Sequence, residues 1–109
     1  MRIKVWHKTN PNFGYPTPER PNTIWPDGYT IAAYVMVPDD AEALDQVEIA
    51  FGLTNSVDYP WYENRETIPV RMPCRSTSVG DIVEIGDRVF EIQDFGVVEI
   101  IKILGKSED

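Results

Sequence analysis

Cysteine and histidine are almost absent from this 109-residue chain, which holds one of each, Cys74 and His7. A single cysteine excludes an intrachain disulfide and a cysteine metal cluster, and a single histidine cannot build a zinc site. The two could in principle form a thiol–imidazole pair, but two isolated residues of these types specify little. We therefore expect no metal and no cofactor, and we expect Cys74 to be a small, half-buried residue.

Basic residues are also scarce, with 10 Lys and Arg against 18 Asp and Glu and a net charge of −8. This balance argues against direct binding to nucleic acid or to an anionic membrane, since both depend on Lys and Arg. It is compatible with a basic protein partner.

Long hydrophobic runs are lacking as well. Met1 leads straight into an alternating charged segment without an apolar signal region, and no run reaches membrane-spanning length. The length suits one domain over residues 1–109. We expect a cytoplasmic protein.

The clearest pattern that is present is a hairpin over residues 82–92, with Gly86-Asp87 as a type II′ or I′ turn. This turn pairs Ile85 with Arg88 and aligns the strands so that alternate residues share a face. The shared apolar face holds Val83, Ile85, Phe90 and Ile92. A second turn at residues 94–96 leads to a third strand over residues 97–104, which is apolar on both faces and expected to be central or covered.

Earlier residues predict two more strands and one helix. Residues 2–7 alternate with period two, and residues 29–37 form an uncharged β-prone run that suits a buried central strand. A helix is expected to start after Asp39-Asp40, to end at Gly52 and to bury Leu44, Val47 and Phe51. Residues 68–72 could add a short edge strand. The predicted fold is α+β: a bent, mainly antiparallel sheet of about five strands, with one packed helix and a C-terminal β-meander.

A proline-rich loop fills residues 8–28, where five prolines prevent a helix or a central strand. Because Phe13, Tyr15 and Trp25 lie among these prolines, we expect a loop packed on the body by its rings rather than disorder. It could serve as a binding loop or as a lid over a sheet edge. Residues 105–109 form a tail that we expect to fray.

Two surface features are candidates for binding a protein partner. Trp61 and Tyr62 lie in a polar loop, and large aromatics of this kind are enriched at interfaces. The alternative is that one ring, that of Trp61, folds back onto the core. The second candidate is the acidic face of the helix, which could equally be a plain solvated surface. This face contains Glu42, Asp45 and Glu48.

Residues 75–81, Arg-Ser-Thr-Ser-Val-Gly-Asp, form the most distinctive motif. A nucleophilic Ser76 or Ser78 would need a base and a G-x-S-x-G turn, which the sequence does not supply. We therefore assign no catalytic residue and expect no enzyme activity. In the structural interpretation, Gly80 allows a special backbone conformation, the serines and Asp81 bond nearby amides, and Arg75 pairs with a carboxylate, for instance on the helix. In the alternative, Arg75, Ser76 and Ser78 form an exposed polar site.

This motif also carries a family resemblance. Residues 51–55 (Phe-Gly-Leu-Thr-Asn), residues 75–82 and the Phe95-Gly96 pair are together similar to small uncharacterised proteins and YodL-like modules of bacterial phages and mobile elements. The likeness spans roughly residues 30–100, but Val97 replaces an expected aromatic residue and the proline-rich loop has no counterpart. The resemblance implies a mobile-element origin, a bacterial host cytoplasm and an accessory binding role, and it supplies no catalytic residue.

Three classes of function therefore remain open. The first is a non-enzymatic protein-binding module, with an acidic anti-defence protein that imitates DNA as a sharper variant. The second is a structural homo-oligomer formed by edge-strand pairing. The third is a small-molecule enzyme, which the sequence supports least.

Overall fold

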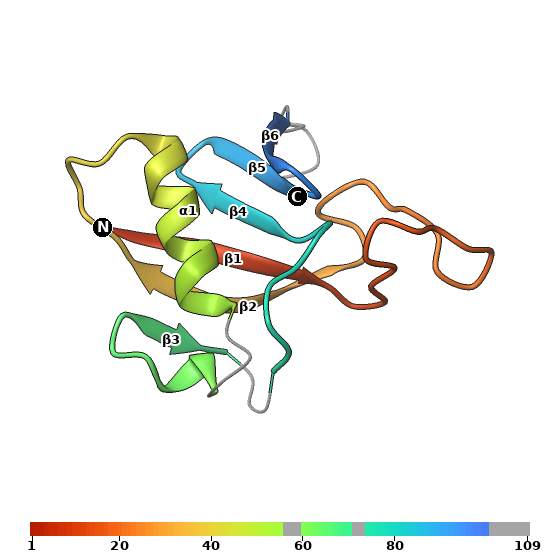
Figure 1. Cartoon of the computed structure of the whole chain (residues 1–109), viewed down its shortest axis with the longest axis horizontal. Helices are drawn as coiled ribbons and strands as arrows, with labels where there is room; N and C mark the ends of the chain where they lie inside the picture. The colour runs from red at the N-terminus through yellow and green to blue at the C-terminus, as the bar shows by residue number, and fades with distance from the viewer. Residues whose placement is uncertain (56–59, 71–73, 101–109) are drawn as a thin grey trace.

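The computed structural model describes residues 1–55, 60–70 and 74–100. It shows one antiparallel sheet of six strands in the order β3-β2-β1-β4-β5-β6, with a single α-helix across one face (Figure 1). The predicted α+β class is confirmed, with six strands instead of about five. The elements are β1 (Arg2–Lys8), β2 (Tyr29–Met36), α1 (Ala43–Thr54), a 3₁₀ turn η1 (Trp61–Glu63), β3 (Thr67–Pro69), β4 (Ile82–Ile85), β5 (Arg88–Gln93) and β6 (Gly96–Ile100).

The β4–β5 hairpin has the predicted register, with Ile85 opposite Arg88 and Val83 opposite Phe90. Gly86 has a φ of 60°, whereas Asp87 is not among the described residues with positive φ, so the turn is type II′. The apolar face of the hairpin joins the main core below α1. This core contains Ile3, Val5, Val35, Val37, Val47, Ala50, Val83, Ile85, Phe90 and Ile92.

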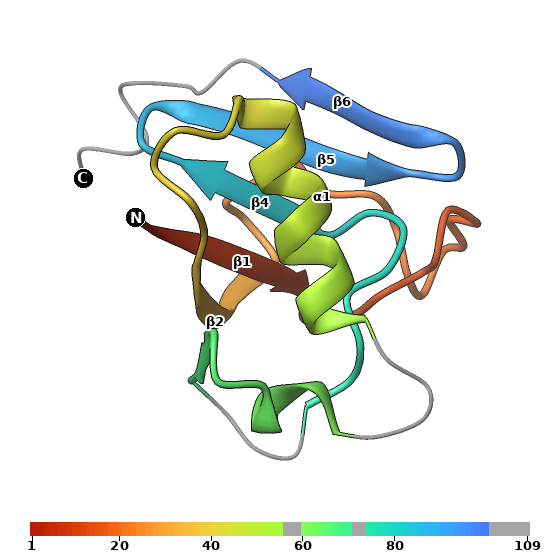
Figure 2. The same cartoon turned by 60° about the vertical axis from the view of Figure 1, so that its left-hand side comes forward.

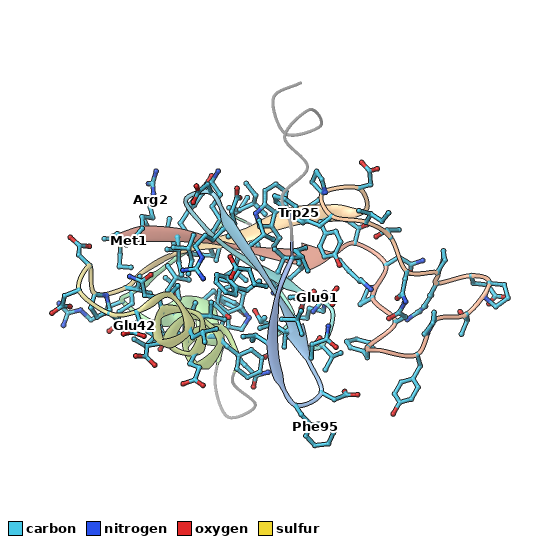
Figure 3. All side chains as sticks on the ribbon, turned by 90° about the horizontal axis from the view of Figure 1, so that it is seen from above. Met1, Arg2, Trp25, Glu42, Glu91 and Phe95 are labelled. Atoms are coloured by element: carbon cyan, nitrogen blue, oxygen red, sulfur yellow. The ribbon has the colours of Figure 1, made fainter. Side chains whose placement is uncertain are left out.

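The opposite face of the sheet is covered by the loop that connects β1 to β2. Trp25 of this loop is buried with Tyr29, Ile82 and Val89, and Trp6 packs against them. Trp25 and Glu42, the residue before α1, lie on opposite sides of the sheet (Figure 3). The central strands are thus covered on both faces, which explains why β4 is buried at every position.

The predicted packing of the proline-rich loop is confirmed only for one ring. Trp25 is buried and covers a sheet face rather than an edge, whereas the Tyr15 side chain is 78% exposed. Phe13 is also exposed, and the guanidinium of Arg75 lies 5.8 Å from its ring centroid.

The helix differs from its prediction at both ends. Glu42 is the N-cap and makes no side-chain cap bond, and Asp39 instead pairs with the amino group of Met1. The helix also continues past the exposed Gly52, because its last carbonyls have partners. Asn64 Nδ2 donates to Leu53 O at 2.8 Å, and Thr77 N–H donates to Thr54 O at 2.8 Å.

The buried face of α1 is also rotated from the predicted one. It contains Gln46, Val47, Ala50 and Thr54. Leu44, expected in the core, is 56% exposed. Gln46 is buried because its amide donates to Pro38 O at 2.8 Å, which satisfies its polar group.

Both edge strands are short. β3 is an edge strand as predicted and begins at Thr67. β6 was expected to be central or covered, and this is wrong for its described part, because β6 is the other edge and Val98 is half-exposed. Residues 101–104 of that expected strand, the expected tail at residues 105–109, and residues 71 and 72 of the edge strand expected over residues 68–72 lie outside the described residues.

Candidate functional site

The Arg75–Asp81 motif forms a pair of charge-assisted hydrogen bonds at the end of β1. Arg75 Nη1 lies 2.6 Å from Asp81 Oδ2, and Arg75 Nη2 lies 2.8 Å from Asp81 Oδ1. The fully buried carboxylate also accepts from the backbone N–H of Lys8 at 3.0 Å and of Ser78 at 2.8 Å. The partner of Arg75 is thus in its own motif and not on the helix. A buried charge is costly unless it is paired and hydrogen-bonded, so these contacts favour the structural interpretation of the motif.

The backbone conformation at Gly80 and the nearby Lys8 side chain explain why the motif has glycine at this position. The φ of Gly80 is 93°, and a Cβ added there would lie 3.2 Å from Lys8 Nζ. Its carbonyl accepts the hydroxyl hydrogen of the buried Tyr29 at 2.7 Å. Burial, followed by the charges of Glu91 and Asp81, raises the pKa of Tyr29 above its ordinary value of 10.0.

The structure brings Cys74 and His7 into contact, which two isolated residues of these types did not predict. Cys74 Sγ lies 3.6 Å from His7 Nδ1. The other ring nitrogen, Nε2, lies 2.9 Å from Thr77 Oγ1 and 3.9 Å from Asp81 Oδ2. Thr77 Oγ1 in turn donates to Thr54 Oγ1 at 2.7 Å, so the chain of contacts runs from the thiol to the end of α1.

This Cys74–His7 pair borders a cavity of about 250 Å³. The cavity is lined by His7, Lys8, Thr9, Pro11, Thr30, Ile31, Ala32, Cys74 and Arg75. His7 is 5% exposed and Cys74 is half-buried, as expected for Cys74, so the cavity gives access to an otherwise covered imidazole.

The two aromatic candidates for partner binding do not form an exposed pair. Trp61 is 2% exposed, and its indole N–H donates to Arg75 O at 2.9 Å. Its ring therefore folds back onto the core, as the alternative interpretation had it, and it cannot contact a partner while the chain is folded. Tyr62 is half-buried, with its ring edge-on to Trp61 at a centroid distance of 5.7 Å.

The acidic helix residues Glu42, Asp45 and Glu48 are all exposed. Glu48 also lines a groove of about 580 Å³ between α1 and the β5–β6 hairpin, the largest of the described cavities. Figure 2 shows α1 crossing the sheet next to β5. We call this the α1–hairpin groove. It is lined by Leu44, Val47, Glu48, Phe51, Ile92, Gln93, Asp94, Gly96 and Val97.

Apolar side chains dominate the α1–hairpin groove, and the charged residues in its described lining, Glu48 and Asp94, are both acidic. Phe95, in the turn between two lining residues, is 99% exposed and projects from the tip of the hairpin (Figure 3). The turn thus adds one exposed apolar ring next to the groove.

Among residues 1–55, 60–70 and 74–100, no group of three or more His, Cys, Asp or Glu side chains could hold a metal ion. Within the same residues, none of the helices has the length and apolar character needed to cross a membrane. No family model matches the chain, and no significant match is found among curated proteins or solved structures.

Sequence reasoning missed the α1–hairpin groove because Leu44 was assigned to the core. A signal was available: the turn residue Phe95 has no apolar neighbours in its own turn with which to pack. The chain of contacts from His7 through Thr77 to Thr54 was also not predicted. These contacts join residues up to 70 positions apart, and they depend on how the end of α1 packs against the motif.

Proposed function

We propose that this protein is a non-enzymatic protein-binding module whose partner docks in the α1–hairpin groove. The observation that carries the proposal is the combination of an apolar groove with a fully exposed Phe95 in the turn between two of the lining residues, Asp94 and Gly96. The groove can receive an apolar side chain of the partner, and Phe95 can insert into a pocket of the partner. Such buried anchor residues contribute most of the binding energy of an interface.

The charge of this region defines the chemistry of the partner. Glu48 and Asp94 line the groove, and Glu42 and Asp45 are exposed at the start of the same helix. The whole chain carries a net charge of −8. We infer an apolar partner segment flanked by Lys or Arg, because such a segment complements the groove in both hydrophobicity and charge.

The biological setting in the proposal rests on the resemblance of residues 75–82 to phage and mobile-element modules. On that basis the protein acts as an accessory factor in the cytoplasm of a bacterial host. The groove supports protein binding more directly than DNA imitation, because an apolar groove has no role in imitating phosphates.

The proposal is tested by affinity capture from host lysate with two matched double variants. Leu44→Asp/Phe95→Asp changes an exposed apolar residue that lines the groove and the exposed ring in the adjoining turn. Ile68→Asp/Val70→Asp makes the same kind of change at the opposite edge strand, where both residues are about half-exposed. We expect a basic partner to be retained by the wild type and the Ile68/Val70 variant and lost by the groove variant. Retention of every captured protein by the groove variant contradicts the proposal.

Two other results would direct attention elsewhere. If the captured protein is another copy of the chain, and if the Ile68/Val70 variant loses it, the edge-pairing oligomer replaces the proposal. If binding competes with duplex DNA and survives in the groove variant, DNA imitation replaces it.

A further inference from the structure

The Cys74–His7 pair carries an inference that is independent of the α1–hairpin groove, since none of the described residues lines both cavities. We propose that Cys74 is a nucleophilic thiol with His7 as its base, and that the adjoining cavity admits a small carbon electrophile that becomes covalently bound to the sulfur. Three separate features carry this proposal: the contact between thiol and imidazole, the fixed orientation of the ring, and the cavity.

The tautomer of His7 follows from the direction of the hydrogen bonds. Thr54 Oγ1 donates its hydrogen to Ala50 O at 2.8 Å, and it therefore accepts the hydrogen of Thr77 Oγ1 at 2.7 Å. Since the only hydrogen of the Thr77 hydroxyl is used in that bond, its oxygen must accept from His7 Nε2–H at 2.9 Å. The neutral ring then carries its proton on Nε2, and the Nδ1 lone pair faces Cys74 Sγ.

This arrangement is the one that a general base for a thiol requires. The Sγ–Nδ1 distance of 3.6 Å suits a hydrogen bond to sulfur, and a partner on the far nitrogen orients the ring. When Nδ1 takes the thiol proton, the resulting imidazolium lies 3.9 Å from Asp81 Oδ2. Among the described residues that line the cavity, Lys8 and Arg75 also carry a charge, and Arg75 is already paired with Asp81.

The covalent step is a nucleophilic substitution. The sulfur forms a bond to the electrophilic carbon, the leaving group departs with the electron pair of the bond that breaks, and the thiol proton ends on His7 Nδ1. No oxidant or reductant is needed. Because Cys74 is the only cysteine, any thiol adduct is located without ambiguity.

Iodoacetamide is the probe, and mass spectrometry of the full chain gives the rate. At about pH 6.5, below the pKa of about 8.5 of a free thiol, we expect the folded protein to react about tenfold faster than the urea-unfolded chain. Thr77→Val removes the acceptor that orients His7 and should abolish this advantage, whereas Thr77→Ser should keep it. A folded chain that reacts no faster than the unfolded chain overturns the proposal, and so does an undiminished rate in a folded Thr77→Val variant.

A second measurement does not depend on any variant. Nitrogen-15 NMR of the single histidine reports which ring nitrogen carries the proton, and no other imidazole is present to overlap. The proposal predicts a proton on Nε2 at neutral pH. A proton on Nδ1 would leave no base facing Cys74 and would overturn the proposal even if Thr77→Val does not fold.

Discussion

Trp25 packs edge-on against Trp6, with ring centroids 5.5 Å apart and an interplanar angle of 89°. This contact fixes the proline-rich loop on the face of the sheet opposite α1. Trp25→Ala should therefore lower the free energy of unfolding by about 3–5 kcal/mol, because it removes a buried ring and leaves a cavity in its place. Tyr15→Ala in the same loop is the control and should change it by less than about 0.5 kcal/mol. Urea unfolding followed by circular dichroism measures both, and equal effects would show that the loop is not held by Trp25.

The Asp81 carboxylate should be the most sensitive polar group in the chain. Asp81→Asn keeps the shape but removes the charge that compensates Arg75 and puts an amide hydrogen among donors, at a cost of about 3 kcal/mol. Asp87→Asn makes the same chemical change in the exposed β4–β5 turn and should have little effect. If Asp81→Asn proves as mild as Asp87→Asn in urea unfolding, the motif does not hold the fold together.

Alkaline pH should destabilise the protein through Tyr29. Its pKa is raised in the folded state, so the folded chain holds the phenolic proton after the unfolded chain has lost it. The contribution of Tyr29 is complete below pH 10.0 and is lost as the pH rises above that value, with a slope of at most about 1.4 kcal/mol per pH unit. In Tyr29→Phe, unfolding free energies measured between about pH 9 and 11 should fall less steeply than in the wild type. Parallel curves would contradict this assignment.

Trp61 and Tyr62 should behave differently although they are adjacent. Trp61→Ala removes a buried ring and its bond to Arg75 O, so we expect a loss of about 3–5 kcal/mol in the free energy of unfolding. Tyr62→Ala at the half-buried neighbour should cost less than half as much, as thermal unfolding can show. A loss of partner binding in Trp61→Ala therefore reports on folding, and only Tyr62→Ala tests that loop as a contact surface. A stable, fully folded Trp61→Ala would contradict the burial of this ring.

Local patterns in the sequence predicted much of this fold. Alternation between Ile82 and Ile92 with a glycine turn determined strand, face and register together, because each is a local property of a hairpin. The uncharged run of β2 likewise predicted a buried central strand.

The sequence could not predict features that depend on distant partners. Gln46 is buried only because Pro38 O accepts its amide, and α1 passes Gly52 only because Asn64 and Thr77 bond its end. The α1–hairpin groove follows from this rotation of the helix, since Leu44 then lines the groove while remaining largely exposed. Periodicity alone cannot rank a satisfied glutamine against an exposed leucine for burial.

The central claim, that a protein partner docks at the α1–hairpin groove, is tested most directly by photo-crosslinking in host cells. A photoreactive phenylalanine analogue at position 95 lies between the groove-lining residues Asp94 and Gly96, and the same analogue at position 68 lies on the opposite edge strand. The account predicts one discrete crosslinked protein from position 95 and none in common with position 68. No adduct at position 95, or the same adduct from both positions, would contradict it.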